Sequence, residues 1–241
     1  MLVALHAGKR VLASADLARG PDYSCPHCDD AVRLHVGSVK TPHFSHLPRS
    51  SCSWAGESRE HLEAKAAVLL SAGLPVLLGN AWDVQAEVAI GKRLAVADLV
   101  ATNGGDSYSI EFQRSLILPD EIRRRTKVHE QHGFKVLWVL LGNPSFDSED
   151  RLVLKDMQRE IAELYGGRIA YYDGQSSMMV LEIVKAIRTI PEREYTDSSG
   201  YDCWVPEREV PYVARYLVRK KSYLRLPHGI PRFFQMCQSR L

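Results

Sequence analysis

The arrangement of apolar and polar positions after residue 57 predicts alternating helices and strands. Residues 57–73 begin with acidic side chains, carry one apolar stripe and end at a glycine, which is the pattern of an amphipathic helix. Residues 82–90, 94–101 and 107–113 are rich in apolar and β-branched side chains, which predicts three strands. Asn103 opens an Asn-Gly-Gly turn between the last two runs, so we expect these runs to form a hairpin.

The same alternation continues through the middle of the chain. Residues 119–133 start at a proline and end at a glycine, as helices often do. Residues 134–141 are almost continuously apolar, as in a strand covered on both faces. A helix over residues 150–165 and a strand over residues 168–173 follow. The order helix, three strands, helix, strand, helix, strand predicts a mixed α/β fold.

Composition divides the 241 residues into three parts. Residues 1–54 are turn-rich and too few to bury a large core, residues 55–195 contain the α/β pattern, and residues 196–241 are rich in tyrosine, proline and arginine. With 45% hydrophobic and 25% charged residues, the chain is not a disordered or coiled-coil protein. Neither a signal peptide nor a run of about 18 apolar residues is present, which favours the cytoplasm and argues against a membrane partner.

Cysteine and histidine gather in the N-terminal part, which predicts a structural metal site. Cys25 and Cys28 form a C-x2-C pair, and His43 and His46 form an H-x2-H pair after fourteen intervening residues. Two such pairs can close a tetrahedral Zn²⁺ site, with Cys52 as an alternative ligand in place of His43 or His46. The role of this zinc would be folding rather than catalysis. Free thiols and surface histidines are the alternative interpretation.

Two acidic residues interrupt apolar strands on either side of the predicted hairpin. Asp98 and Glu111 are about equally far from the turn, so we expect them side by side, where two carboxylates repel unless a cation lies between them. Mg²⁺ or Mn²⁺ held there would activate water for attack on a phosphodiester. Gln113 shares the strand face of Glu111 and could orient a water molecule or a phosphate oxygen. Solvent-facing edge residues are the alternative interpretation.

The helix that precedes the hairpin contributes a polar stripe. Glu57, His61 and Lys65 are spaced four residues apart and therefore share one helix face. A third acid and a base from this helix would complete a phosphodiesterase site beside the hairpin. A solvated helix face with weak charge pairs is the alternative.

Several motifs of this chain, taken in order, resemble one known family. They are CPHC and HFSH, the Glu57-Ser-x-x-His61 motif with Lys65, VADLV around Asp98, IEFQ-x-S from Ile110 to Ser115, Arg125-Thr126 and the strand GFKVLWVLLG. In this set and order, between about residues 23 and 142, the chain resembles the competence protein CoiA-like family, whose nuclease domain belongs to the PD-(D/E)xK superfamily.

The resemblance implies a small zinc-binding β module followed by a restriction-endonuclease-like mixed sheet flanked by helices, acting on DNA in uptake and recombination. It also implies that Asp98 and Glu111 are Mg²⁺ or Mn²⁺ ligands and that Glu57 is a helix-borne acid. Gln113 occupies the place of the lysine in the E-x-K motif of the broader superfamily. Lys65 is the candidate to supply the missing charge, and His61 is a candidate base.

The net charge of +2 hides an uneven distribution along the chain. Residues 55–205 carry a net charge of −6, whereas residues 206–241 contain eight basic and two acidic residues, interleaved with five aromatic rings. Basic side chains bind phosphates and aromatic rings stack on bases, so this segment is the predicted nucleic-acid contact. The candidates are Arg215, Arg219, Lys220, Lys221 and Arg225. A basic segment that packs its rings into the core is the alternative.

Three functions remain open at this point. The leading hypothesis is a divalent-metal-dependent deoxyribonuclease that serves DNA uptake, recombination or defence. The second is a DNA-binding recombination accessory that keeps the nuclease fold without hydrolysis, and Gln113 motivates it. The third is a zinc-stabilised protein-interaction module. The partners compatible with these hypotheses are single- or double-stranded DNA, a second copy of the chain, and proteins of recombination or DNA uptake.

Overall fold

The N-terminal part of the chain is a small antiparallel sheet. A computed structural model describes residues 1–20, 22–48, 50, 52, 57–72, 82–92 and 94–238. The first five strands are β1 (Val3–His6), β2 (Lys9–Leu12), β3 (Tyr23–Ser24), β4 (Ala31–His35) and β5 (His43–His46), in the spatial order β2-β1-β3-β4-β5. They bury a core of their own around Tyr23 and Phe44, whose ring centroids lie 5.0 Å apart. We call residues 1–52 the N-terminal module.

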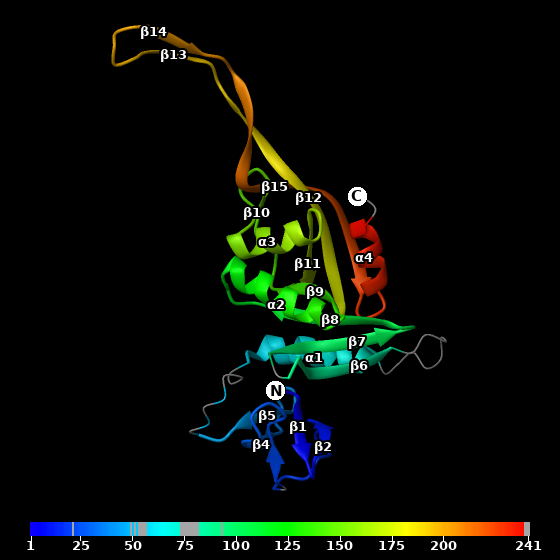
Figure 1. The fold of residues 1–241 in the computed structure, drawn as a ribbon. Helices are drawn as coiled ribbons and strands as arrows, with labels where there is room; N and C mark the ends of the chain where they lie inside the picture. Colours follow the sequence, from blue (N-terminus) through cyan, green and yellow to red (C-terminus); the bar gives the residue numbers. More distant parts are fainter. Residues whose placement is uncertain are drawn as a thin grey trace.

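Eight further strands build one sheet in the order β10-β15-β12-β11-β9-β8-β7-β6. They are β6 (Asp83–Ile90), β7 (Ala95–Asn103), β8 (Asp106–Gln113), β9 (Lys135–Leu141), β10 (Leu152–Val153), β11 (Arg168–Tyr172), β12 (Ser177–Ile190) and β15 (Arg208–Arg225). Strand β9 pairs parallel with β8 and β11, and the other neighbours are antiparallel. The predicted fold class, a mixed sheet flanked by helices, is confirmed (Figure 1).

Among the described residues, four helices accompany this sheet. They are α1 (Arg59–Ala72), α2 (Pro119–Gln131), α3 (Asp156–Leu164) and α4 (Ile230–Gln238). Helix α2 begins at Pro119 as predicted. Proline has no backbone N–H, and the N–H groups of the first helical turn have no partner within the helix, so proline costs no hydrogen bond at this position. Helix α3 is shorter than predicted, because a turn and β10 take up its expected first residues. No helix in the part of the chain that the structure describes is long and apolar enough to cross a membrane.

The hairpin between β7 and β8 forms where the sequence predicts it. Asn103 pairs with Asp106, which leaves Gly104 and Gly105 as a two-residue turn. Both glycines have positive φ angles, 64° and 98°. Two-residue hairpin turns need this backbone conformation, and glycine adopts it without a Cβ clash.

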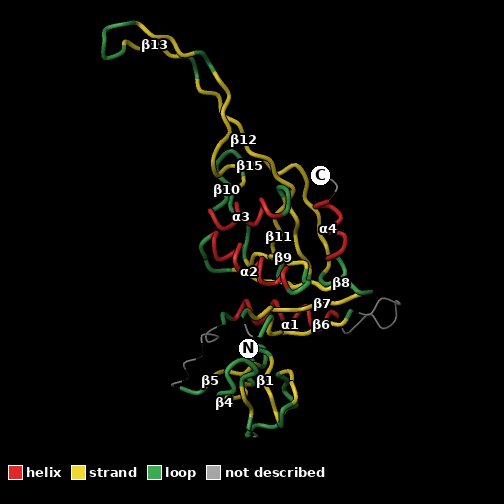
Figure 2. Tube along the Cα trace, viewed as in Figure 1, coloured by secondary structure: helices red, strands yellow, loops and turns green. Residues whose placement is uncertain are grey.

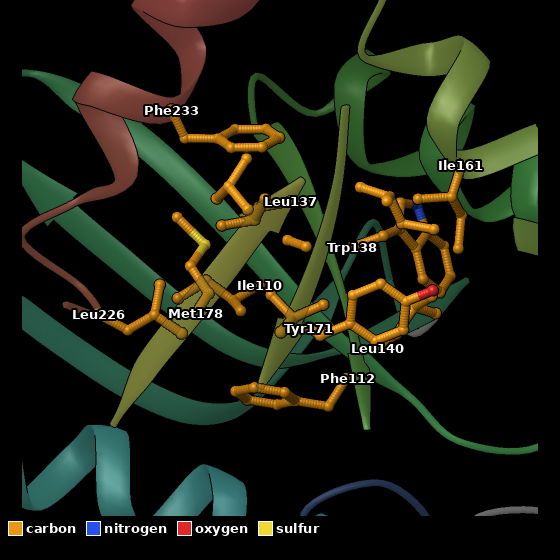
Figure 3. Close-up of a cluster of buried hydrophobic side chains, with 14 of the residues drawn as sticks. Ile110, Phe112, Leu137, Trp138, Leu140, Ile161, Tyr171, Met178, Leu226 and Phe233 are labelled. Atoms are coloured by element: carbon orange, nitrogen blue, oxygen red, sulfur yellow. The ribbon is translucent and has the colours of Figure 1, made fainter. Parts of the chain in front are cut away.

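The main core lies between the eight-stranded sheet and its helices. Ile110, Leu137 and Met178 come from three different strands and lie near Phe233 of α4 (Figure 3). Burial of one such side chain contributes about 1.5–3 kcal/mol, so this cluster holds the central strands and α4 together. Trp138 is also fully buried, and its indole N–H donates to Thr126 Oγ1 at 2.9 Å, which satisfies its polar atom.

The C-terminal part extends the main sheet. Composition alone sets residues 196–241 apart from the α/β part, but β15 pairs along most of its length with β12 inside the same sheet. The far halves of these two strands leave the body as a long arm, whose tip is formed by β13 (Arg193–Thr196) and β14 (Asp202–Val205) (Figures 1 and 2). Local patterns could not reveal this pairing because the partners are distant in the sequence.

The N-terminal module packs against the edge strand β6 of the main sheet. Leu2 and Val3 belong to the module by sequence but are buried in the main core. Arg10 of β2 donates through Nη2 to the backbone oxygen atoms of Ala86 at 2.5 Å and of Glu87 at 3.1 Å. Apolar contacts and hydrogen bonds therefore join the module to the larger part of the chain.

Candidate functional site

Four side chains with metal-binding atoms converge in the N-terminal module. The Sγ atoms of Cys25, Cys28 and Cys52 and one ring nitrogen of His46 all lie within 4.8 Å of one another. His46 Nε2 and Cys28 Sγ are 3.4 Å apart. Burial raises the pKa of Cys25, and it raises the pKa of Cys28 to about 12. A divalent cation would offset the charge of these thiolates, and three cysteines with one histidine suit a closed tetrahedral zinc site.

His43 lies outside this cluster. Its Nδ1 atom is 2.9 Å from the Thr41 carbonyl oxygen, and its ring stacks on His35 at a centroid distance of 5.1 Å. His43 and His46 are three positions apart in strand β5, so their side chains point to opposite faces of the sheet. The structure therefore brings together the set in which Cys52 replaces His43.

A second group of metal-binding atoms lies between α1 and β7. One carboxylate oxygen of Glu57, one ring nitrogen of His61 and one carboxylate oxygen of Asp98 lie within 4.8 Å of one another. The helix predicted from residue 57 begins at Arg59, so Glu57 is not a helix-borne acid but lies just before α1, and His61 lies in the first turn of α1. Both side chains reach Asp98 of β7. Carboxylates suit Mg²⁺ or Mn²⁺, and the imidazole favours a transition metal.

Asp98 is ionised by its surroundings. Its Oδ2 atom lies 2.8 Å from His61 Nε2 and accepts a hydrogen bond of 2.8 Å from the Phe112 backbone N–H. Burial alone would raise the pKa of Asp98, but the charges of His61 and Lys65 and these hydrogen bonds lower it to about 2. For His61, burial lowers the pKa because it disfavours the charged imidazolium. The negative charge of Asp98 outweighs burial, so the net effect is a raised pKa of His61. The carboxylate therefore carries its negative charge at neutral pH.

Lys65 is enclosed between two carboxylates. Its Nζ atom pairs with Glu57 Oε1 and lies 2.7 Å from Glu87 Oε1. Burial favours the neutral amine, but the neighbouring carboxylates Glu87, Asp98 and Glu57 prevail and raise the pKa of Lys65. The side chain is 0% exposed, so the charged amine holds Glu57 in place and does not face a substrate. The hypothesis that Lys65 supplies the charge of the missing E-x-K lysine stays a prediction.

Glu111 lies beside Asp98 but outside the three-residue group. The register pairs Leu99 with Ile110, so the next positions, Asp98 and Glu111, are neighbours across the two strands, as the hairpin predicts. Glu111 is 0% exposed and pairs with Arg125 of α2. Burial raises the pKa of Glu111 well above its ordinary value, although the Arg125 charge opposes this effect.

Two further polar side chains lie behind Glu111. Ser109 Oγ is 2.6 Å from His129 Nδ1 and 3.4 Å from Glu111 Oε1. Burial lowers the pKa of His129 to about 4, so this imidazole is neutral at neutral pH. Gln113, at the end of the same strand, donates through Nε2 to the Ser115 carbonyl oxygen at 2.6 Å. The carboxylate is thus surrounded by polar groups of β8 and α2.

Comparison with known proteins bears on both groups of residues. The family described as competence protein CoiA, N-terminal domain, matches residues 9–55, and the family described as competence protein CoiA, nuclease-like domain, matches residues 57–196. The second match alone covers more than half of the chain. The chain belongs to the competence protein CoiA family.

One curated relative matches within this family. The competence protein CoiA of Bacillus subtilis (strain 168) is 27% identical over 124 residues, which are 49% of this chain and 31% of the relative. The match thus spans less than a third of that CoiA protein. No solved structure matches the chain. The cysteine-rich group falls in the CoiA N-terminal region, and Glu57, His61 and Asp98 fall in the CoiA nuclease-like region.

Sequence patterns alone do not identify three residues of this CoiA-family site, which are Glu87, Arg125 and His129. Glu87 occupies a polar position in the alternating pattern of β6 and therefore resembles a solvent-facing residue. Arg125 is part of a motif, but nothing in the sequence pairs it with Glu111. His129 is detectable in principle, because Ile122 lies seven residues earlier on the same buried face of α2.

The basic residues predicted to contact nucleic acid lie on β15. Arg215 pairs through Nε with Asp147 Oδ2 at 2.9 Å, and the other four candidates are exposed. Lys221, Tyr223 and Arg225 alternate along the strand and therefore share one face. The Tyr223 ring is 60% exposed, and Lys221 Nζ lies 5.4 Å from its centroid. This face offers two cations and one aromatic surface to the solvent.

Proposed function

We propose that this chain is a divalent-metal-dependent deoxyribonuclease that hydrolyses DNA phosphodiester bonds in the cytoplasm, in the service of DNA uptake, recombination or defence. The observation that carries the proposal is the convergence of Glu57, His61 and Asp98 beside the buried carboxylate of Glu111. These groups come from the start of α1 and the residues just before it, from β7 and from β8, all in the region that matches a CoiA nuclease-like domain.

The side chains of this centre have distinct proposed tasks. Mg²⁺ or Mn²⁺ bound here would supply a Lewis acid and an activated water. Asp98 and Glu57 are negative at neutral pH because their positive neighbours outweigh burial and lower both pKa values. Glu111 is proposed as a further ligand, which requires Arg125 to release or share it. His61, with 23% of its side chain exposed, is proposed to hold a proton beside the reacting water, and Gln113 is proposed to orient that water or a phosphate oxygen.

DNA is the proposed partner, and β15 is its proposed contact. Lys221 and Arg225 would neutralise backbone phosphates while Tyr223 stacks on an exposed base. Arg219 and Lys220 are exposed next to them in the same strand, but Lys220 directly precedes Lys221 and therefore points to the other face. Arg215 is engaged by Asp147.

Zinc is the proposed ion of the N-terminal cluster, in a structural role. Cys25, Cys28, His46 and Cys52 supply four donors, which is the number that a structural zinc site requires. The module has few apolar residues for its own core, so bound metal would contribute directly to its folding.

A non-catalytic DNA-binding accessory is the second candidate. Gln113 replaces the expected lysine, and its amide is engaged by the Ser115 carbonyl oxygen. The enclosure of the Lys65 amine by Glu57 and Glu87 favours this candidate, because the amine would have to leave both carboxylates to take the place of that lysine. The accessory function predicts salt-sensitive DNA binding without cleavage under any divalent metal.

The test is cleavage of labelled single- and double-stranded DNA by the purified chain with Mg²⁺, with Mn²⁺ and with a chelator. Asp98→Asn retains an acceptor for the Phe112 N–H, and Glu111→Gln retains the side-chain volume, so both variants should fold. We expect each to reduce metal-dependent cleavage to background. Asp106→Asn, at the exposed tip of the same hairpin, is the matched control and should cleave like the parent chain. Undiminished cleavage by both site variants would contradict the nuclease assignment, and DNA binding without cleavage by the parent would favour the accessory.

A further inference from the structure

Glu87 is a buried carboxylate at the centre of edge strand β6. Its neighbours in the alternating pattern, Gln85 and Ala89, are exposed, whereas Glu87 is only 1% exposed. Its φ angle is 55°, a left-handed conformation that is rare for a residue with a side chain. Such conformations persist where surrounding contacts over-determine them, and they gather at functional sites.

The contacts that hold Glu87 come from two separate parts of the chain. Its Oε1 atom accepts a hydrogen bond from the Leu2 backbone N–H at 2.6 Å, and its Oε2 atom accepts one from the Val3 backbone N–H at 2.8 Å. The third donor is Lys65 Nζ of α1, at 2.7 Å from Oε1. Arg10 donates to the Glu87 backbone oxygen at 3.1 Å. One carboxylate thus joins the N-terminal module to the helix that carries the candidate nuclease site.

A continuous series of contacts connects this carboxylate with both groups of metal-binding residues. On one side, Phe44 of β5 donates its backbone N–H to the Met1 carbonyl oxygen at 2.9 Å, next to Leu2, and the same strand carries His46. On the other side, Lys65 pairs with Glu57 of the second group. The steps between the two groups are hydrogen bonds between named atoms or neighbouring residues along the backbone, and the Met1 amine also pairs directly with Glu57 Oε2 at 3.1 Å.

We infer that Glu87 is a positioning residue through which the folded N-terminal module fixes Lys65, and through Lys65 the carboxylate of Glu57, for divalent-metal binding. Glu87 accepts from the Leu2 and Val3 N–H groups only when the start of the N-terminal module is docked, and the same carboxylate then orients the buried ammonium. Residues that hold metal ligands in place typically change metal affinity about 10- to 100-fold when they are replaced. The inference rests on the proposed metal-dependent centre and adds that the module helps to form it.

Two measurements on the full chain test this positioning role. The first is Mn²⁺ affinity, followed by the loss of the free-ion signal in electron paramagnetic resonance. The second is the protection of Lys65 from a water-soluble amine-modifying reagent, followed by mass spectrometry. We expect Glu87→Gln to weaken Mn²⁺ binding at least about tenfold and to make Lys65 accessible, while cysteine-bound zinc is retained. Cys28→Ser, which removes a proposed zinc ligand, should produce both changes together with loss of zinc.

A matched control separates positioning from general destabilisation. Asp147→Asn removes an ion-pair partner of Arg151 and Arg215 at the opposite end of the sheet, so it should lower stability without altering either readout. Unchanged Lys65 protection in folded Glu87→Gln would overturn the inference, and so would unchanged Mn²⁺ affinity despite labelling of Lys65. If the parent chain binds no Mn²⁺, the proposed nuclease centre fails, while the labelling experiment still decides whether Glu87 and the module hold Lys65.

Discussion

The identity of the fourth zinc ligand is the most direct test of the N-terminal module. Cys52→Ser removes a sulfur that lies within 4.8 Å of the ligand atoms of Cys25, Cys28 and His46. His43→Asn removes an imidazole that contacts Thr41 and His35 instead. We therefore expect Cys52→Ser to lose zinc and His43→Asn to retain it.

The expected size of the effect follows from the number of ligands. Zinc binding contributes about 10–16 kcal/mol in small zinc-dependent folds, and an even share among four ligands is about 3 kcal/mol. That share corresponds to a loss of affinity of at least about 100-fold for Cys52→Ser. Because serine is close to cysteine in size, the loss would report on coordination and not on packing.

The assay is competition between the chain and a coloured zinc chelator, with total zinc measured after denaturation. Circular dichroism before the titration establishes that both variants are folded at the start. Loss of zinc from His43→Asn with retention in Cys52→Ser would refute the assignment and restore the H-x2-H pair as ligands. Equal, undiminished affinity in both variants would refute the four-residue site itself.

Two further predictions concern charge. Arg125→Met leaves the Glu111 carboxyl buried without its cation, and a buried polar group without its partner costs about 1–3 kcal/mol. Because burial already raises the pKa of Glu111, this carboxyl can stay protonated, so we expect a loss of about 2 kcal/mol in urea unfolding, with the exposed Lys127→Met on the same helix as control. In DNA-binding titrations at several salt concentrations, Lys221→Ala and Arg225→Ala should each reduce the salt slope by about 1, and Arg215→Ala should reduce it less because of its Asp147 pair. An unchanged slope in the first two would exclude β15 as the phosphate contact.

The elements that the sequence predicts well are those whose signals are local. The turn at Gly104 and Gly105, the proline at the start of α2 and the apolar run of β9 each depend on neighbours within a few residues. The hairpin then determines that Asp98 and Glu111 are neighbours, so the central part of the site is predictable as well. Pairing of β12 with β15 depends on contacts between distant segments, and no local pattern encodes it.

The ligand set of the module shows a different limit of sequence reasoning. Spacing suggests that His43 and His46 act as a pair, since C-x2-C and H-x2-H motifs look equivalent in one dimension. The outcome depends on the backbone: a tight turn presents Cys25 and Cys28 on one side, whereas a strand presents His43 and His46 on opposite sides. Cys52 can replace His43 because the chain returns to the cluster after β5.

Glu87 illustrates why a buried charge can be invisible in a single sequence. In an isolated strand β6, the face that carries Asp83, Gln85 and Glu87 would be exposed, and the alternation of polar and apolar residues is consistent with that arrangement. Burial arises only because β1 covers the end of this face and directs two backbone N–H groups at the carboxylate. The site therefore depends on a contact between two regions that separate family matches describe, residues 9–55 and 57–196. A nuclease-like region produced without the module would leave the Glu87–Lys65 pair without two of its hydrogen bonds, which makes the intact chain the appropriate object for every measurement of activity.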